Sequence, residues 1–317
     1  MVKAGFLFPG QGAQAVGMGR ALAESYPDAK QIFDRADAIL GKGLSKICWE
    51  GPPEELTRTE HAQPALYVTS FAALAALQAE LKAAGGANFK PAAAAGLSLG
   101  EYTALAAAGA YDWEAGLKLV QQRADAMEAA ARVSSGTMAS VMGMEREALE
   151  AICAKTGAEV ANLNAPAQIV ISGPVEAVRQ AVERARTAGA KRAIELTVGG
   201  AFHSRLMRPA AEKLEAALKG ITVEAPEVPT ASNVTGRFHE GPESIRTLLA
   251  EQLCKPVLWE ADVRTLIRAG ARLFLELGAG SVLKGLIRRI DPAIEVLPVG
   301  TPEEAKGAAA RLSGDNA

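Results

Sequence analysis

The chain has 317 residues, of which 49% are hydrophobic and 22% charged, and its formal net charge at pH 7 is −2. This composition is typical of a soluble globular protein with room for a large and a smaller domain, and no basic cluster indicates a nucleic-acid partner. No apolar run reaches the ~18 residues that a membrane-spanning helix needs, so we expect no membrane association.

The number and spacing of the cysteines indicate the redox state of the cellular compartment. Cys48, Cys153 and Cys254 are odd in number and far apart in the sequence. This spacing predicts neither a disulfide framework nor a zinc site, so we expect no metal and a reducing compartment. The N-terminal residues lack the length and order of regions of a signal peptide. We therefore expect a cytoplasmic protein.

Hydrophobic periodicity predicts alternating strands and helices from the N-terminus onward. The elements expected in the first third are a strand at 2–8, helices around 18–22, 32–39 and 63–81, and a loop at 48–59.

The stretch that follows residue 91 has the pattern of a nucleophile elbow, in which a strand enters a sharp turn with serine at its apex and a helix follows. A short apolar run at 92–95 leads into Gly96-Leu-Ser98-Leu-Gly100, and a small-residue helical pattern comes next. The two glycines permit a close backbone approach that a Cβ would obstruct. We expect Ser98 Oγ to stand above the sheet beside peptide N–H groups that can stabilise an oxyanion. The alternative is a Gly-rich turn with a solvated serine.

Beyond the elbow, Asp112 is the expected N-cap of a helix that runs to about residue 131. The next six elements have the order βαββαβ, which is typical of a ferredoxin-like unit. Its strands are expected at 137–144, 159–164, 168–172 and 192–197, and its helices at 146–155 and 175–188. Four helices at 209–218, 244–253, 261–269 and 281–290 and a strand at 273–277 follow. The last dozen residues are expected to fray.

These patterns predict an α/β fold with two parts. A large α/β-hydrolase-like catalytic domain with a parallel-sheet core comprises residues 1–132 and 199–317. A small ferredoxin-like subdomain, 133–198, is inserted into it.

Three histidines are available as a base for Ser98. His61 is expected in the loop before a helix, and His239 in a turn-like segment. His203 lies where a predicted strand gives way to a helix, and the carboxyl edge of an open α/β sheet is where catalytic groups gather. Position therefore favours His203, then His239, then His61. The alternative for each is an ordinary surface or hydrogen-bonded histidine.

Arg123 is predicted on a helix among the apolar residues Leu119, Val120 and Met127. Burying its charge alone is costly, so we expect it to pair with an internal acid or with a carboxylate of the substrate. The fork of a guanidinium matches a carboxylate through two hydrogen bonds. The alternatives are a structural ion pair and a solvated arginine.

A dinucleotide site is a competing interpretation, because Gly10-Gln-Gly-Ala-Gln-Ala15 follows a strand and matches Gly-x-Gly-x-x-Ala. The acid expected about 20 residues later should end a second strand, but Asp28 and Asp34 fall within helical periodicity. A second glycine pair, Gly278-Ala-Gly280, lacks a third glycine. We therefore favour two tight strand-to-helix turns, of which the first could bring a backbone N–H to an oxyanion.

With these residues in place, the whole chain resembles the malonyl-CoA:acyl-carrier-protein transacylases of fatty-acid synthesis. Eight spaced matches occur in the order of the family. They are 8–14 (Phe-Pro-Gly-Gln-Gly-Ala-Gln), 60–65 (Glu-His-Ala-Gln-Pro-Ala), 96–105, 121–123 (Gln-Gln-Arg), 162–168, 201–204 (Ala-Phe-His-Ser), 233–236 (Asn-Val-Thr-Gly) and 275–280.

The resemblance implies a Ser–His dyad. Ser98 would be acylated by malonyl-CoA, and His203 would be the general base and acid. An oxygen near Gln252 would orient the histidine in place of a triad acid. The backbone N–H groups of Gln11 and Leu99 would form the oxyanion hole.

The resemblance also implies the substrates. Arg123 would hold the free malonyl carboxylate, and malonyl-CoA and acyl carrier protein would be the partners of a monomer that needs no cofactor. Phe202 resembles the residue of malonyl-selective members, so we expect malonyl rather than methylmalonyl transfer. Leu97 is a departure, since many members have histidine there; that histidine is not the family's base, so activity is still expected.

Two other functions compete with the transacylase. A hydrolase on an α/β-hydrolase scaffold usually has the order Ser, acid, then His near the chain end, which this chain does not follow. A non-enzymatic docking protein would not need Ser98, His203, Arg123 and Gln11 together. We therefore favour the transacylase.

Overall fold

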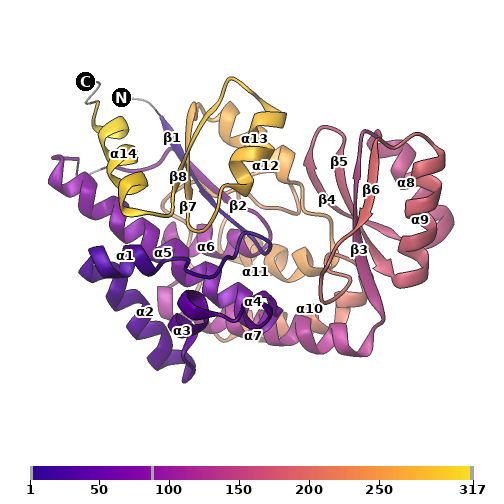
Figure 1. The fold of residues 1–317 in the computed structure, drawn as a ribbon, viewed down its shortest axis with the longest axis horizontal. Coiled ribbons are helices and arrows are strands. Elements are labelled where there is room, and N and C mark those ends of the chain that lie inside the picture. The colour runs from indigo at the N-terminus through magenta and orange to yellow at the C-terminus, as the bar shows by residue number, and fades with distance from the viewer. Residues whose placement is uncertain (1–2, 87–88, 315–317) are drawn as a thin grey trace.

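The computed structural model describes residues 3–86 and 89–314 (Figure 1). Its larger part is built on a four-stranded, wholly parallel sheet of order β2-β1-β7-β8. The strands are β1 (Ala4–Phe8), β2 (Ala93–Gly96), β7 (Leu273–Leu277) and β8 (Glu295–Val299). The first three are buried at every position, as expected of parallel strands covered on both faces. The predicted α/β class is confirmed.

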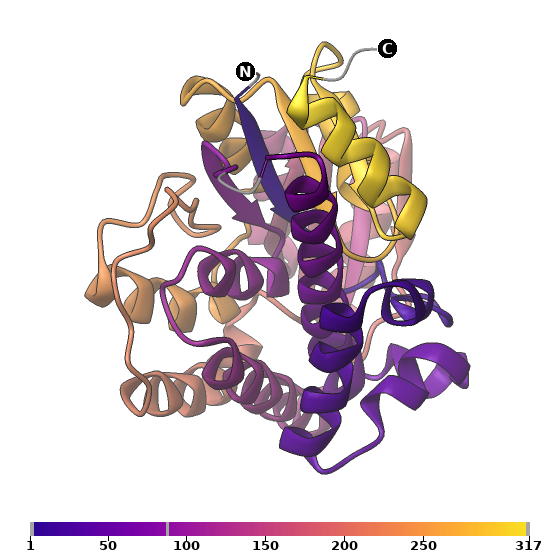
Figure 2. The same cartoon turned by 90° about the vertical axis from the view of Figure 1, so that its left-hand side faces the viewer.

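Helices cover both faces of this sheet. Phe6 and Phe8 of β1 join the core formed with α5 (Thr59–Ala83) and α6 (Leu99–Ala107). Leu7 between them points the opposite way, against α12 (Trp259–Arg268) and α13 (Val282–Ile290). The alternation follows from the period of two along a strand. Figure 2 shows the dark purple α5 running along the sheet.

The long helix α5 belongs to the core. Its 25 residues are long and apolar enough to cross a membrane by composition, but 67% of its most apolar window is buried inside the protein. Pro64 lies within it and has no N–H to donate, which frees the carbonyl of Glu60. That carbonyl accepts hydrogen bonds from Lys42 Nζ at 3.1 Å and Gln121 Nε2 at 3.3 Å instead.

The remaining helices of the larger part surround this core. They are α1 (Arg20–Ser25), α2 (Pro27–Leu40), α3 (Leu44–Glu50), α4 (Pro53–Thr57), α7 (Trp113–Val133), α10 (Arg208–Lys219), α11 (Pro242–Glu251) and α14 (Pro302–Ser313), with short 3-10 turns at η1 (Arg205–Met207) and η2 (Gln252–Cys254). The predicted cap of α7 is confirmed, because the Asp112 carboxylate accepts hydrogen bonds from the backbone N–H groups of Glu114 and Ala115.

A second, antiparallel sheet lies at the right of Figure 1, with α8 and α9 packed on it. Its elements are β3 (Gly136–Met142), α8 (Arg146–Thr156), β4 (Glu159–Ala165), β5 (Gln168–Pro174), α9 (Val175–Thr187) and β6 (Arg192–Glu195). The strand order β4-β5-β3-β6 is the one that a ferredoxin-like βαββαβ chain adopts. We propose that residues 133–198 form the inserted subdomain.

Two expectations about secondary structure are wrong, and one strand was missed. The expected loop at 48–59 contains the end of α3 and all of α4, separated by Gly51 and Pro52. The C-terminal residues do not fray as a block, since α14 continues to Ser313 from a capping box between Thr301 and Glu304. Strand β8, which carries Pro298, was not predicted. Residues 315–317 lie outside the described part.

Candidate active site

The turn between β2 and α6 has the geometry of an elbow. Ser98 occupies its apex with φ 51° and ψ −101°, a left-handed conformation that is strained for serine. A Cβ on Gly96 would lie 1.8 Å from the carbonyl carbon of Gly100. A Cβ on Gly100 would lie 2.1 Å from the carbonyl oxygen of Phe8. Both glycines are therefore required for the close approach that the sequence predicted.

His203 faces this serine. Its Nε2 lies 2.8 Å from Ser98 Oγ, and its Nδ1 lies 2.7 Å from the backbone carbonyl oxygen of Gln252. Because a carbonyl can only accept, Nδ1 carries the proton and Nε2 presents its lone pair to the hydroxyl. Like Ser98, His203 has a positive φ, 56°. The pair is a dyad in which a backbone carbonyl stands in the place of an acid.

The surroundings keep His203 neutral. Burial and then the positive charge of Arg123 lower the pKa of His203 to about 4, against an ordinary value of 6.5. At neutral pH its Nε2 is therefore free to accept a proton from Ser98, which is the protonation state that a general base needs.

Arg123 of α7 reaches the same serine from another side. The side chain is buried, and its NH2 group donates to Ser98 Oγ at 3.0 Å and to Gln252 Oε1 at 2.9 Å. Its NH1 group donates to Gln63 Oε1 at 2.6 Å. The Tyr102 ring lies 4.9 Å from the guanidinium carbon, within cation–π range. Across residues 3–86 and 89–314, Arg123 forms no ion pair.

The two residues predicted to supply an oxyanion hole, Gln11 and Leu99, line the same cavity as Ser98. The N–H of Ser98 itself donates to Asn233 Oδ1 at 2.7 Å. Within the described residues, the N–H groups of Leu99 and Gln11 donate to no protein acceptor. The loop that carries Gln11 lies against the elbow, because a Cβ on Gly10 would be 2.3 Å from the carbonyl oxygen of Leu97.

A cavity of about 300 Å³ opens onto these groups. Of the predicted site residues, Gln252 alone lies behind its wall; those that line the cavity are Gln11, Ser98, Leu99, Arg123, Phe202 and His203. The structure therefore brings all seven predicted residues to one place, while their catalytic roles stay predictions.

The other two histidines have different surroundings. His239 is buried, and its Nε2 pairs with Glu101 Oε1 at 2.8 Å rather than with Ser98. His61 is in the first turn of α5, not in the loop where we expected it, and its Nδ1 lies 2.9 Å from the carbonyl oxygen of Glu55. Geometry thus favours His203, as position did.

A buried polar network behind the site was missed at the sequence level. Glu101 Oε2 accepts from Gln252 Nε2 at 2.6 Å, and Asn233 Nδ2 donates to Asp262 Oδ2 at 2.8 Å. Gln63 was quoted within a motif but given no role. The one feature of the sequence that could have indicated a role for Gln63 is its position as a polar amide among the apolar residues of a predicted helix.

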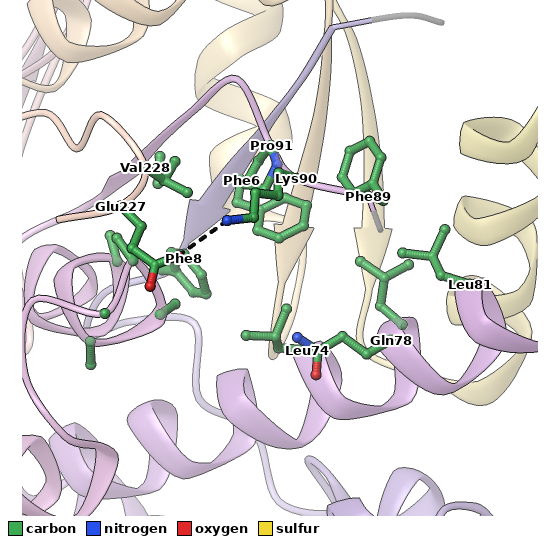
Figure 3. Close-up of a pocket in the computed structure, with 17 residues that line it drawn as sticks. Phe6, Phe8, Leu74, Gln78, Leu81, Phe89, Lys90, Pro91, Glu227 and Val228 are labelled. Atoms are coloured by element: carbon green, nitrogen blue, oxygen red, sulfur yellow. Dashed lines mark hydrogen bonds and ion pairs between the residues drawn. The ribbon is translucent and has the colours of Figure 1, made fainter. Parts of the chain in front are cut away.

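A second cavity of similar size, about 300 Å³, lies behind β1 (Figure 3). Phe6, Phe8 and Leu74 line it, and the ion pair of Lys90 and Glu227, 3.2 Å apart, crosses its rim. It contains no nucleophile beside a base, so it is not a candidate for the chemistry.

Comparison with known proteins agrees with this geometry. A family model described as acyl transferase domain matches residues 5–298. The malonyl CoA-acyl carrier protein transacylase of Bacillus subtilis is 43% identical over 321 residues, covering 100% of this chain and 99% of the relative.

Solved structures give the same result. The malonyl CoA-acyl carrier protein transacylase of Coxiella burnetii superimposes with a TM-score of 0.93 at 37% identity, covering 98% of both chains. A malonyl-transacylase solved in complex with its type II polyketide acyl-carrier protein gives a TM-score of 0.91 at 35% identity, covering 98% of this chain and 99% of the other.

Proposed function

The chain belongs to the acyl transferase family, as one of its malonyl CoA-acyl carrier protein transacylases, and on this basis we propose how its residues carry the reaction. The enzyme transfers a malonyl group from malonyl-CoA to the thiol of acyl carrier protein and so supplies fatty-acid biosynthesis. The transfer proceeds in two half-reactions through a malonyl ester on Ser98.

In the first half-reaction, His203 Nε2 takes the proton of Ser98 Oγ as that oxygen attacks the thioester carbonyl. The N–H groups of Gln11 and Leu99 donate to the oxyanion of the tetrahedral intermediate. The intermediate collapses, the C–S bond breaks, and the imidazolium of His203 returns the proton to the departing CoA thiolate. The 2.8 Å distance between Oγ and Nε2 is the observation that carries this step.

The second half-reaction reverses the roles of the sulfur and the serine. The carrier-protein thiol gives its proton to His203 and attacks the ester, again through an intermediate at the oxyanion hole. The ester C–O bond breaks, and His203 returns the proton to Ser98 Oγ. No step needs a metal or an organic cofactor, and we propose that the enzyme uses none.

Arg123 selects the acyl group. Its NH2 group lies 3.0 Å from Ser98 Oγ, so a carboxylate two bonds beyond the ester carbonyl carbon can pair with the guanidinium. An acetyl group would leave the buried charge without a counterion, which disfavours it. Phe202 lies beside the dyad, and its ring limits the space for a branched acyl group such as methylmalonyl.

We place the enzyme in the cytoplasm, because all three cysteines are free thiols. Burial raises the pKa of Cys48 and of Cys153 to about 12, which keeps both protonated and unreactive.

The test is intact-protein mass after brief mixing with malonyl-CoA, with Ser98→Ala and Ser172→Ala beside the wild type. Ser172 is a buried serine of the antiparallel sheet and serves as the matched control. We expect a malonyl adduct on the wild type and Ser172→Ala, none on Ser98→Ala, and discharge when holo-acyl carrier protein is added. An adduct that persists in Ser98→Ala contradicts the proposal, and rapid discharge by water alone would favour a hydrolase.

A further inference from the structure

Among the residues that the structure describes, every acceptor to which the Arg123 guanidinium donates a hydrogen bond is neutral. They are the amide oxygens of Gln63 and Gln252 and the hydroxyl of Ser98, at 2.6, 2.9 and 3.0 Å. A buried arginine ordinarily pairs with a carboxylate, because an uncompensated buried charge is expensive. Here the described residues provide acceptors that fix the position of the guanidinium without neutralising it.

The buried acid in this network turns its oxygens elsewhere. Glu101 Oε1 faces His239 Nε2, and Glu101 Oε2 accepts from Gln252 Nε2 and from the backbone N–H of Asn233. The Gln252 amide therefore stands between the carboxylate and Arg123. The negative charge of Glu101 helps to keep Arg123 protonated, but it occupies none of the N–H groups of the guanidinium.

The two glutamines differ in their other contacts. Gln252 Nε2 also donates to the backbone carbonyl oxygen of Ser98, and the backbone carbonyl of Gln252 accepts from His203 Nδ1. Changing Gln252 would therefore disturb the dyad. Within the described residues, the Gln63 side chain makes two hydrogen bonds: its Oε1 accepts from Arg123 NH1, and its Nε2 donates to Met127 Sδ at 3.4 Å. It is fully buried in α5 and does not line the cavity. Its two hydrogen-bond partners, Arg123 and Met127, both line the cavity, and only Arg123 carries a charge. The electrostatic effect of Gln63 on the acyl group therefore acts through Arg123.

We propose that Gln63 is a positioning residue that sets acyl specificity: its neutral amide oxygen holds the Arg123 guanidinium in place and leaves the positive charge for the carboxylate of the substrate. This inference rests on the proposed function. A carboxylate at the same position would be an internal counterion. It would compete with the malonyl carboxylate and remove the penalty on acyl groups that have none.

The test compares Gln63→Glu, which adds a charge at constant shape, with Gln63→Met, which removes the acceptor without adding charge. Each protein is mixed with equal concentrations of malonyl-CoA and acetyl-CoA, and the two adducts on Ser98 are counted by intact mass. Because both donors compete for the same folded molecules, the adduct ratio does not depend on the folded fraction. The control is Gln78→Glu, an exposed glutamine of the same helix.

We expect Gln63→Glu to lower the malonyl-to-acetyl ratio about 100-fold, as the loss of a charge-assisted pair implies. The loss should appear as a raised KM for malonyl-CoA with an unchanged or improved reaction of acetyl-CoA. Gln63→Met should lower the ratio by about three- to tenfold, as the loss of one hydrogen bond implies, and Gln78→Glu should keep the wild-type ratio.

Two results would overturn the inference: a wild-type ratio in Gln63→Glu, or an equal fall of the ratio in Gln63→Glu and Gln63→Met. If Gln63→Glu yields no folded protein, a wild-type ratio in Gln63→Met decides against a positioning role. Failure of the proposed function is recognised separately, since the wild type would then form no Ser98-dependent malonyl adduct at all.

Discussion

Two buried histidines of this molecule differ in what accepts their hydrogen bonds. His239 pairs with a carboxylate, Glu101, and both side chains are completely buried. His203 pairs with a backbone carbonyl, that of Gln252, and its other nitrogen faces Ser98 Oγ in an open cavity. By residue type alone, the histidine with the acid looks more like part of a catalytic triad.

The difference shows that access to the nucleophile decides which histidine can be a base. A carboxylate partner would stabilise the imidazolium, whereas a neutral carbonyl mainly fixes the tautomer and orientation. For His203, the neighbouring positive charge of Arg123 disfavours the imidazolium further. No acid contacts His203, but Glu101 lies behind the site, where its carboxylate accepts a hydrogen bond from the side-chain amide of Gln252.

The largest expected effect separates the two histidines by rate. His203→Ala should lower acylation of Ser98 by malonyl-CoA about 10³-fold or more, because the base is lost while the oxyanion donors remain. His239→Gln should keep the rate per folded molecule within about tenfold of the wild type, since His239 does not contact Ser98. Single-turnover labelling followed by mass measures both. Equal losses of the acylation rate in the two variants would contradict the assignment of His203 as the base.

The second effect separates them by stability. His239→Ala should lower the free energy of unfolding by about 2 kcal/mol, because the buried Glu101 Oε1 loses its hydrogen-bond partner. His61→Ala, at a partly exposed site, should cost less than about 1 kcal/mol. Urea unfolding monitored by circular dichroism gives both values. A cost for His239→Ala no larger than for His61→Ala would mean that the pair does not hold the fold.

The third effect is on pH dependence. His203 is neutral and competent above its lowered pKa, so acylation by acetyl-CoA should persist to about pH 5 and be lost as the pH falls through about 4. An acetyl donor is used because it has no carboxylate that titrates nearby. Arg123→Ala removes one of the two causes of the lowered pKa of His203, so the acidic limb of the pH–rate profile should move up toward pH 6.5. An unmoved limb would show that Arg123 does not act on His203.

Much of this molecule could be predicted from local signals in the sequence. The elbow depends on Gly96 and Gly100, whose spacing around Ser98 reflects a backbone contact that no other residue permits. The βαββαβ order and the cap at Asp112 are likewise local. His203 and Arg123 could be selected because each is a polar residue in an apolar or strand-end context.

What could not be predicted depends on contacts between distant segments. Glu101 and His239 are 138 positions apart, and nothing near either residue indicates the other. Strand β8 was missed because it contains Pro298, and proline disfavours strands. The strand still forms because it lies at the edge of the sheet, where the N–H that proline lacks has no neighbouring strand to bond to. Helix α4 was missed because Pro52 and Pro53 resemble a loop, although proline is favoured in the first turn of a helix.

The positive φ angles of Ser98 and His203 have a consequence for the evolution of this fold. Among the described residues, Ala167 is the one other non-glycine in that region, so the strain is concentrated on the dyad. Ser98→Gly or His203→Gly should relieve it and raise the melting temperature while abolishing transfer. A lineage that no longer needed the reaction would therefore gain robustness by discarding these two residues first. An inactive descendant should then be recognised by glycines at the two places where the active enzyme tolerates strain.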